Sequence, residues 1–144
     1  MSRIVKFLGI LLCCLLTAAC VSDVSVRSEF EKSVKDYNRM LRWQEIESAG
    51  LHFLEADQHE AFMTSSQAIR KRGITITDYR ILASVVLPEQ GTGNAIVEFD
   101  YYILPSNRIK TVTYKQDWVY REIGKREHFK KMNWKLKSGL PAFD

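Results

Sequence analysis

The spacing of apolar residues changes about halfway along the chain. From residue 28 to about residue 72, apolar residues recur every three or four positions, the period of an amphipathic helix. From Ile74 onward they alternate with polar or small residues, the period of a strand. The pattern therefore predicts helices first and strands afterwards.

The first helix is predicted to begin at Ser28. Ser28 and Glu31 have the S-x-x-E spacing of a capping box, whose side chains accept hydrogen bonds from free amide groups of the first turn. The apolar pattern continues to Leu54, with a predicted break at Ala49-Gly50. A further helix is predicted over residues 58–72, because Gly73 follows a basic run as it often does at helix ends.

The alternating half predicts four strands. A change of phase after Ile76 predicts a β-bulge near Thr77-Asp78. Short turns separate the strands, and short connections favour antiparallel neighbours. The predicted strands span residues 74–87, 95–104, 109–122 and 129–137, with turns at 88–94, 105–107 and 124–125.

This order predicts an α+β fold, in which two or three N-terminal helices pack on a curved four-stranded antiparallel sheet. The expected organisation is a segment 1–19 that is removed, a tether at 20–27 and a single domain at 28–144.

Residues 1–19 have the three parts of a secretory signal peptide. Arg3 and Lys6 supply positive charge, an apolar run follows from Phe7 to Leu16, and small residues come next. Ten apolar residues rise only about 15 Å as a helix, half of a bilayer core of about 30 Å, so a transmembrane helix fits less well.

The stretch Leu16-Thr17-Ala18-Ala19-Cys20 resembles the lipobox of bacterial lipoproteins, although Thr17 stands where leucine is usual. The resemblance implies cleavage before Cys20 and acylation of its thiol and new amine. Three acyl chains would anchor the chain permanently. Since Val21 follows where inner-membrane lipoproteins carry aspartate, the resemblance also implies the periplasmic side of the outer membrane. Ordinary signal cleavage nearby is the alternative.

Removal of the signal peptide changes the charge and cysteine content. The mature chain keeps 19 Lys and Arg against 17 Asp and Glu, which is not the charge of a nucleic-acid-binding protein. Residues 106–144 are more basic, with 10 basic and 4 acidic residues. Cys13 and Cys14 leave with the signal peptide and Cys20 would be acylated, so neither a disulfide nor a cysteine metal site is predicted.

Helices followed by aromatic-rich strands make residues 29–143 similar to the nuclear-transport-factor-2-like superfamily, which includes ketosteroid isomerase and polyketide cyclases. The similar strings are residues 37–43, 76–79, 134–136 and 139–141. The resemblance implies a cone-shaped fold and, in many members, a homodimer through the outer sheet face. It does not imply one activity, because the superfamily includes enzymes, carriers and scaffolds.

Aromatic residues on the predicted strands are candidates for lining a pocket. Core packing is their default role, and the alternative is that a cone leaves a cavity between sheet and helices for a small apolar ligand. These residues are Tyr79, Phe99, Tyr101, Tyr114, Trp118, Tyr120 and Trp134.

Other polar positions give weaker predictions of chemistry. His52, Glu55 and His59 would share one face of an unbroken helix, but the two histidines would lie about 10 Å apart along its axis, too far to hold one metal ion. Asp100 beside tyrosines is similar to the acid–base site of ketosteroid isomerase, but alternation places it opposite Phe99 if Phe99 is buried.

The sequence contains no catalytic triad and no phosphate-binding loop, and neither a metal nor a cofactor is predicted. We therefore expect a non-catalytic, lipid-anchored interaction module that contacts an envelope protein partner. A carrier of a small apolar ligand and an isomerase-like enzyme that uses Asp100 are the alternatives.

Overall fold

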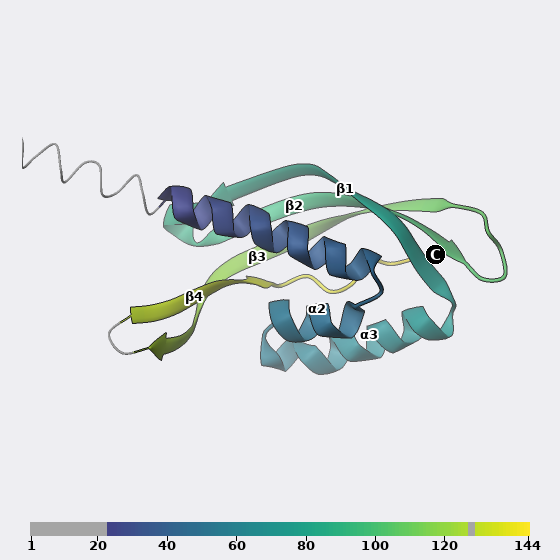
Figure 1. Ribbon diagram of the computed structural model, residues 1–144, viewed down its shortest axis with the longest axis horizontal. Coiled ribbons are helices and arrows are strands. Elements are labelled where there is room, and N and C mark those ends of the chain that lie inside the picture. Colours follow the sequence, from purple (N-terminus) through teal and green to yellow (C-terminus); the bar gives the residue numbers. More distant parts are fainter. Residues whose placement is uncertain (1–22, 127–128) are drawn as a thin grey trace, which may run out of the picture.

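The computed structural model describes residues 23–126 and 129–144 (Figure 1). In this part of the chain, three helices precede a four-stranded antiparallel sheet with strand order β1-β2-β3-β4. The predicted α+β arrangement is thus confirmed. The elements are an N-terminal helix described over 23–42, α2 (Ile46–Phe53), α3 (His59–Lys71), β1 (Ile74–Leu87), β2 (Thr92–Ile103), β3 (Lys110–Arg126) and β4 (Phe129–Leu136).

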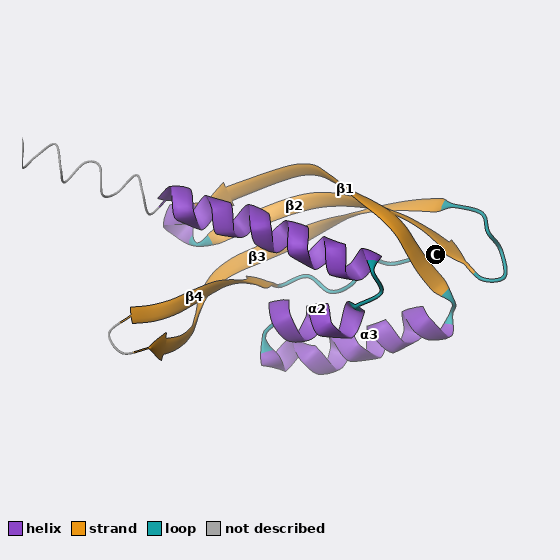
Figure 2. Ribbon diagram, viewed as in Figure 1, coloured by secondary structure: helices purple, strands orange, loops and turns teal. Residues whose placement is uncertain are grey.

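The helices lie on one face of the sheet. The N-terminal helix runs along the strands, while α2 and α3 pack beside it (Figure 2). The inner face of the sheet is the one that these helices cover, and the outer face is the opposite one. Buried Phe30 and Tyr37 from the N-terminal helix and Phe53 from α2 all contact the ring of Trp118 on β3. None of the helices in the described residues is long and apolar enough to cross a membrane.

The N-terminal helix begins before Ser28, so the predicted capping box is wrong. Residues 23–27 are already helical, which also removes that part of the predicted tether. Tertiary contacts account for the earlier turns, because Trp134 Nε1 donates to Val26 O at 3.2 Å and Tyr120 Oη donates to Glu29 Oε2 at 2.8 Å. The first helical turns are thus held by β3 and β4.

The predicted break at Ala49-Gly50 is also wrong, because both residues lie within α2. A Cβ atom at Gly50 would lie 2.5 Å from the Phe62 ring of α3. Glycine at this position therefore permits the close approach of two helices. The chain turns instead at Gln44, whose φ of 63° is left-handed.

Four strands are present as predicted, although β2 begins at Thr92, within the turn predicted at 88–94. The bulge predicted near Thr77 is confirmed by a register shift between Ile76 and Asp78, and a second shift follows between Ile81 and Ala83. The predicted turn at Gly124-Lys125 is wrong, since β3 continues to Arg126. A register shift between Glu122 and Gly124 lets the strand pass through the glycine.

Candidate functional site

The seven aromatics predicted as pocket-lining residues are on the sheet. Phe99, Tyr101, Trp118 and Trp134 are buried, whereas Tyr79, Tyr114 and Tyr120 are partly buried. Their rings pack on one another and on aromatics of the helices: the centroid of Trp134 lies 4.9 Å from that of Phe30 and 5.1 Å from that of Tyr120. The inner face is therefore a packed aromatic layer in the region where the sequence offered a cavity as an alternative.

A buried polar network interrupts this layer, and the sequence analysis did not predict it. Asn38 and Gln116, both fully buried, join the N-terminal helix to β3, with Gln116 Nε2 donating to Asn38 Oδ1 at 2.7 Å. Gln116 Nε2 also donates to Tyr114 Oη, and Trp118 Nε1 donates to Gln116 Oε1. The available signal was Gln116 itself, a polar residue in phase with inward-facing Tyr114 and Trp118.

Two tyrosines beside this network are held in their neutral form. Burial raises the pKa of Tyr37 and of Tyr114 well above the ordinary value, because a phenolate would lose its hydration. For Tyr37, the neighbouring Tyr114 raises the pKa further. These phenols are poorly suited to act as bases near neutral pH.

The end of the inner face near Tyr101 is closed by the segment that contains Phe143. The Phe143 ring is buried and packs against those of Phe99 and Tyr101. The backbone of this segment is bound as well: Arg72 Nη1 donates to Phe143 O at 2.6 Å, and Tyr101 Oη donates to Asp144 O at 2.9 Å. The chain itself thus fills this end of the aromatic layer.

Asp100 lies on the outer face, opposite buried Phe99. Arg80 reaches both carboxylates of β2, with Nη2 2.6 Å from Glu98 Oε1 and Nη1 3.0 Å from Asp100 Oδ2. Thr111 Oγ1 donates to Asp100 Oδ1 at 2.8 Å, and this hydrogen bond, with those from Arg80, lowers the pKa of Asp100. Asp100 is therefore an ionised, paired carboxylate outside the aromatic layer. This does not match the acid–base site that the resemblance to ketosteroid isomerase suggested.

Next to this charged ladder, β1 and β2 expose large apolar side chains, which we call the apolar stripe. Their exposed fractions are high for a sheet: 54% for Leu82, 54% for Val85, 40% for Leu87 and 39% for Ile96. Register places Val85 opposite Asn94 and Leu87 opposite Thr92, so these two side chains share the outer face with Ile96. The alternation in the sequence did not predict the stripe. The bulge between Ile81 and Ala83 shifts the register, so that Ile81 pairs with inward-facing Val97 but Val85 lies on the outer face.

Two glutamates of the helical half, Glu47 and Glu55, form ion pairs with cations of other elements. Glu55 accepts a hydrogen bond from Lys137 at 2.9 Å and pairs with Arg121 at 3.3 Å, and these cations, Lys137 foremost, lower its pKa. Glu47 pairs with Arg70 at 2.6 Å. Within the described residues, no three His, Cys, Asp or Glu residues are arranged to hold a metal ion.

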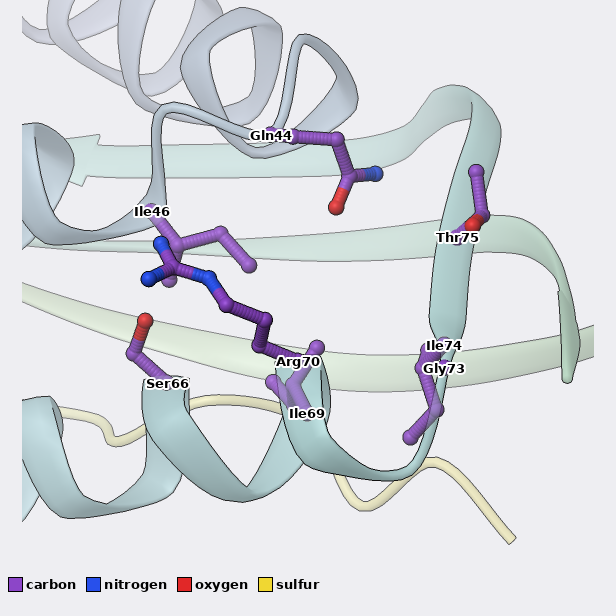
Figure 3. Close-up of a pocket in the computed structure, with 8 residues that line it drawn as sticks. All are labelled: Gln44, Ile46, Ser66, Ile69, Arg70, Gly73, Ile74 and Thr75. Atoms are coloured by element: carbon purple, nitrogen blue, oxygen red, sulfur yellow. The ribbon is translucent and has the colours of Figure 1, made fainter. Parts of the chain in front are cut away.

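Small surface pockets occur between the helices and the ends of the sheet. One of about 280 Å³ lies between α2, α3 and the start of β1; Gln44 and Thr75 lie across it from Ser66, and the Arg70 side chain extends toward Ile46 (Figure 3). Another, of about 330 Å³, lies beside Leu54 and Phe62. None of the seven predicted aromatics lines either pocket.

Cys20, the predicted lipidation site, lies outside the described residues.

No protein-family model matches the chain, and the searches of curated proteins and of solved structures found no match either.

Proposed function

We propose that this chain is a lipoprotein, acylated at Cys20 and held on the periplasmic side of the outer membrane, and that its domain is a non-catalytic module that binds an envelope protein. The apolar stripe is the observation that carries the binding role. Val85, Leu87 and Ile96 lie on the outer face of adjacent strands and keep much of their apolar surface in solvent. Exposed apolar patches of this kind are typical of protein contact sites.

The neighbouring charges give the stripe the form of a protein-binding surface. Val85, Leu87 and Ile96 supply the apolar centre, and the ladder of Arg80, Glu98 and Asp100 lies along one side of it. Interfaces commonly combine an apolar centre with a polar rim. A partner with apolar side chains beside basic and acidic groups would complement both parts.

The two alternative functions have less support from the geometry. A carrier needs an interior cavity, and the inner-face rings pack against each other and against Phe143. An isomerase-like enzyme needs a carboxyl group in an apolar pocket, and Asp100 is instead paired with Arg80 on the outer face. Native mass spectrometry of the mature chain tests the carrier directly, since extra mass lost on denaturation would support it.

The anchor is tested by metabolic labelling with an alkyne analogue of palmitate. The wild-type chain should incorporate the label and Cys20→Ala should not, because the acylated thiol is absent. Cys14→Ala is the matched control, since Cys14 lies six residues earlier within the predicted signal peptide, and it should label normally. Labelling of Cys20→Ala at the wild-type level would refute the lipid anchor.

The binding surface is tested by photo-crosslinking in intact cells. A photoreactive phenylalanine analogue at Val85 should give a discrete crosslinked protein, whereas the same analogue at Leu104, equally exposed but away from the stripe, should not. Crosslinks to a second copy of this chain would instead assign the stripe to a homodimer. No crosslink from Val85 or Ile96 would contradict the binding role.

A further inference from the structure

The pocket between α2, α3 and the start of β1 contains a buried hydroxyl group that has no hydrogen-bond partner. Ser66 is only 2% exposed, and its hydroxyl forms no hydrogen bond within the described residues. Figure 3 shows this hydroxyl pointing away from α3, toward Ile46. Thr64 and Ser65, the two residues before it, instead donate to the carbonyl oxygens four residues earlier. Since buried hydroxyl groups usually have a partner, Ser66 is available to a molecule bound in the pocket.

Arg70 supplies the charge of this pocket, since the other residues that line it are uncharged. Its Nη2 donates to Glu47 Oε1 at 2.6 Å, which holds the guanidinium in place and occupies one of its several N–H donors. Within the described part of the chain, Nε and Nη1 form no hydrogen bond and are available to an anion. The side chain is 71% exposed, so Arg70 lies at the mouth of the pocket.

The inner wall of the pocket is apolar. Ile46, Ile69 and Ile74 come from α2, α3 and β1, and each of them is 6% exposed or less. Their side chains offer a surface for a hydrocarbon group, because apolar contact removes that group from water. The pocket thus combines a cationic mouth with an apolar interior.

The side of the pocket opposite Ser66 is polar and weakly bonded. Gln44 and Thr75 lie on this side (Figure 3). Gln44 Nε2 is 3.5 Å from Ile76 O, at the limit of a hydrogen bond, and the Thr75 hydroxyl has no partner among the described residues. A carboxylate can accept more hydrogen bonds than Arg70 alone would donate, so these groups can contribute further ones.

The volume of the pocket limits what can bind there. It is about 280 Å³, just below the range of about 300–1,000 Å³ that is typical of pockets for drug-sized molecules. A small molecule therefore fits. An inorganic anion would leave the apolar wall unused, and a hydrocarbon without charge would leave Arg70 and Ser66 unused.

We propose that this pocket binds a small aliphatic carboxylate. Its carboxylate accepts hydrogen bonds from Arg70 and Ser66, and its hydrocarbon part packs on the three isoleucines. The site is separate from the apolar stripe and from the packed aromatic layer, because no residue of either lines it. The inference therefore depends neither on the lipid anchor nor on a protein partner.

The test titrates the full chain, purified in detergent, with isovalerate and follows isotope-labelled isoleucine methyl groups by nuclear magnetic resonance. Isovalerate joins a carboxylate to a short branched hydrocarbon, and isovaleramide is the matched probe without charge. We expect saturable shifts at Ile46, Ile69 and Ile74, with none at Ile96 on the outer face. Isovaleramide should bind about tenfold more weakly, because hydrogen bonds to a charged group are stronger than those to a neutral one.

Four variants separate binding from a structural role. Arg70→Gln should weaken isovalerate binding about tenfold and Ser66→Ala about fivefold, because each removes one hydrogen-bond donor from the site. Lys71→Gln removes the same charge from the next residue, which does not line the pocket, and should bind as the wild type does. Ser65→Ala removes a hydroxyl that is already bonded to Ala61 O, and it should also leave binding unchanged.

The other outcomes would overturn the inference. The absence of saturable shifts at the three isoleucines at millimolar isovalerate would show that the pocket does not bind such a ligand. Equal affinity for isovaleramide would remove the carboxylate as the recognised group. Equal shifts at Ile96 would indicate nonspecific association. Wild-type affinity in Arg70→Gln would show that the guanidinium does not bind the probe.

Discussion

The inner and outer faces of the sheet are built from alternate residues of the same strands, yet they differ in almost every contact. On β2, Val97 and Phe99 are fully buried under the helices, while the alternating residues Glu98 and Asp100 both bind Arg80 on the outer face. On the inner face, the aromatic side chains are buried against one another and against the helices. On the outer face, the charged side chains of the ladder are paired, but the apolar side chains of the stripe stay exposed to solvent.

This difference separates stability from recognition. The inner aromatics resemble the residues of a functional pocket in their identity, but their contacts are those of a core. Val85 and Ile96 contribute less to the fold than the inner aromatics, because 54% and 39% of their surface is exposed to solvent. Substitutions should therefore change stability when made on the inner face and binding when made on the outer face.

The largest expected loss of stability follows Trp134→Ala. Trp134 is fully buried and contacts Phe30 and Tyr120, so its truncation should lower the free energy of unfolding by about 3–5 kcal/mol. Chemical denaturation followed by circular dichroism measures this loss. Val85→Ala on the outer face is the matched control and should cost well under half as much; equal losses would contradict the division between the two faces.

Addition of one methyl group to the inner face should cost less but remain measurable. A Cβ atom at Gly93 would lie 2.6 Å from Phe30 Cε2, so Gly93→Ala should destabilise the domain by about 1–3 kcal/mol through overpacking. The same method measures it. A neutral effect would mean that Phe30 can move away freely and that the aromatic layer is loosely packed.

The two faces should also respond to opposite extremes of pH. Burial raises the pKa of Tyr120 to about 12, so the unfolded chain ionises first above pH 10 and stability falls as pH rises from there toward 12. Asp100 has a lowered pKa, so its contribution is present above the ordinary value near 3.8 and is lost as pH falls through the folded-state pKa. Unfolding measured across pH should show that Tyr120→Phe reduces the alkaline loss and that Asp100→Asn reduces the acid loss, while Tyr37, Tyr114 and Glu55 maintain the remainder.

The smallest effect is expected for Arg80→Ala. Its side chain is 50% exposed, and ion pairs at exposed positions contribute little to stability. The loss of stability should be the smallest of this series and should shrink further in high salt. A loss as large as that of Trp134→Ala would show that the ladder is part of the core.

The sequence predicted the order of elements because two strong periodicities determine it. The 3.6-residue spacing around Tyr37 and the alternation around Phe99 each survive in the structure. Boundaries were less predictable where tertiary contacts decide them: β3 and β4 stabilise the helix before Ser28, and the Phe62 ring explains Gly50 within a helix.

The candidate surface was harder to predict than the fold. The alternation correctly placed Asp100 opposite Phe99, but the apolar stripe depends on the register shift after Ile81, which no local residue pattern indicates. The Asn38–Gln116 pair joins positions 78 residues apart, so neither residue signals its partner. Such pairings depend on how the N-terminal helix packs on the folded sheet and not on neighbouring residues in the chain.

The bond between Trp134 Nε1 and Val26 O joins positions 108 residues apart, and Phe143 closes the core still later in the chain. The apolar faces of the early helices thus have no final partner until β3 and β4 have been synthesised. Folding that depends on such distant contacts is slow to begin. A polypeptide built in this order remains open during its synthesis, and its domain can close only after the strands and the segment with Phe143 have been added.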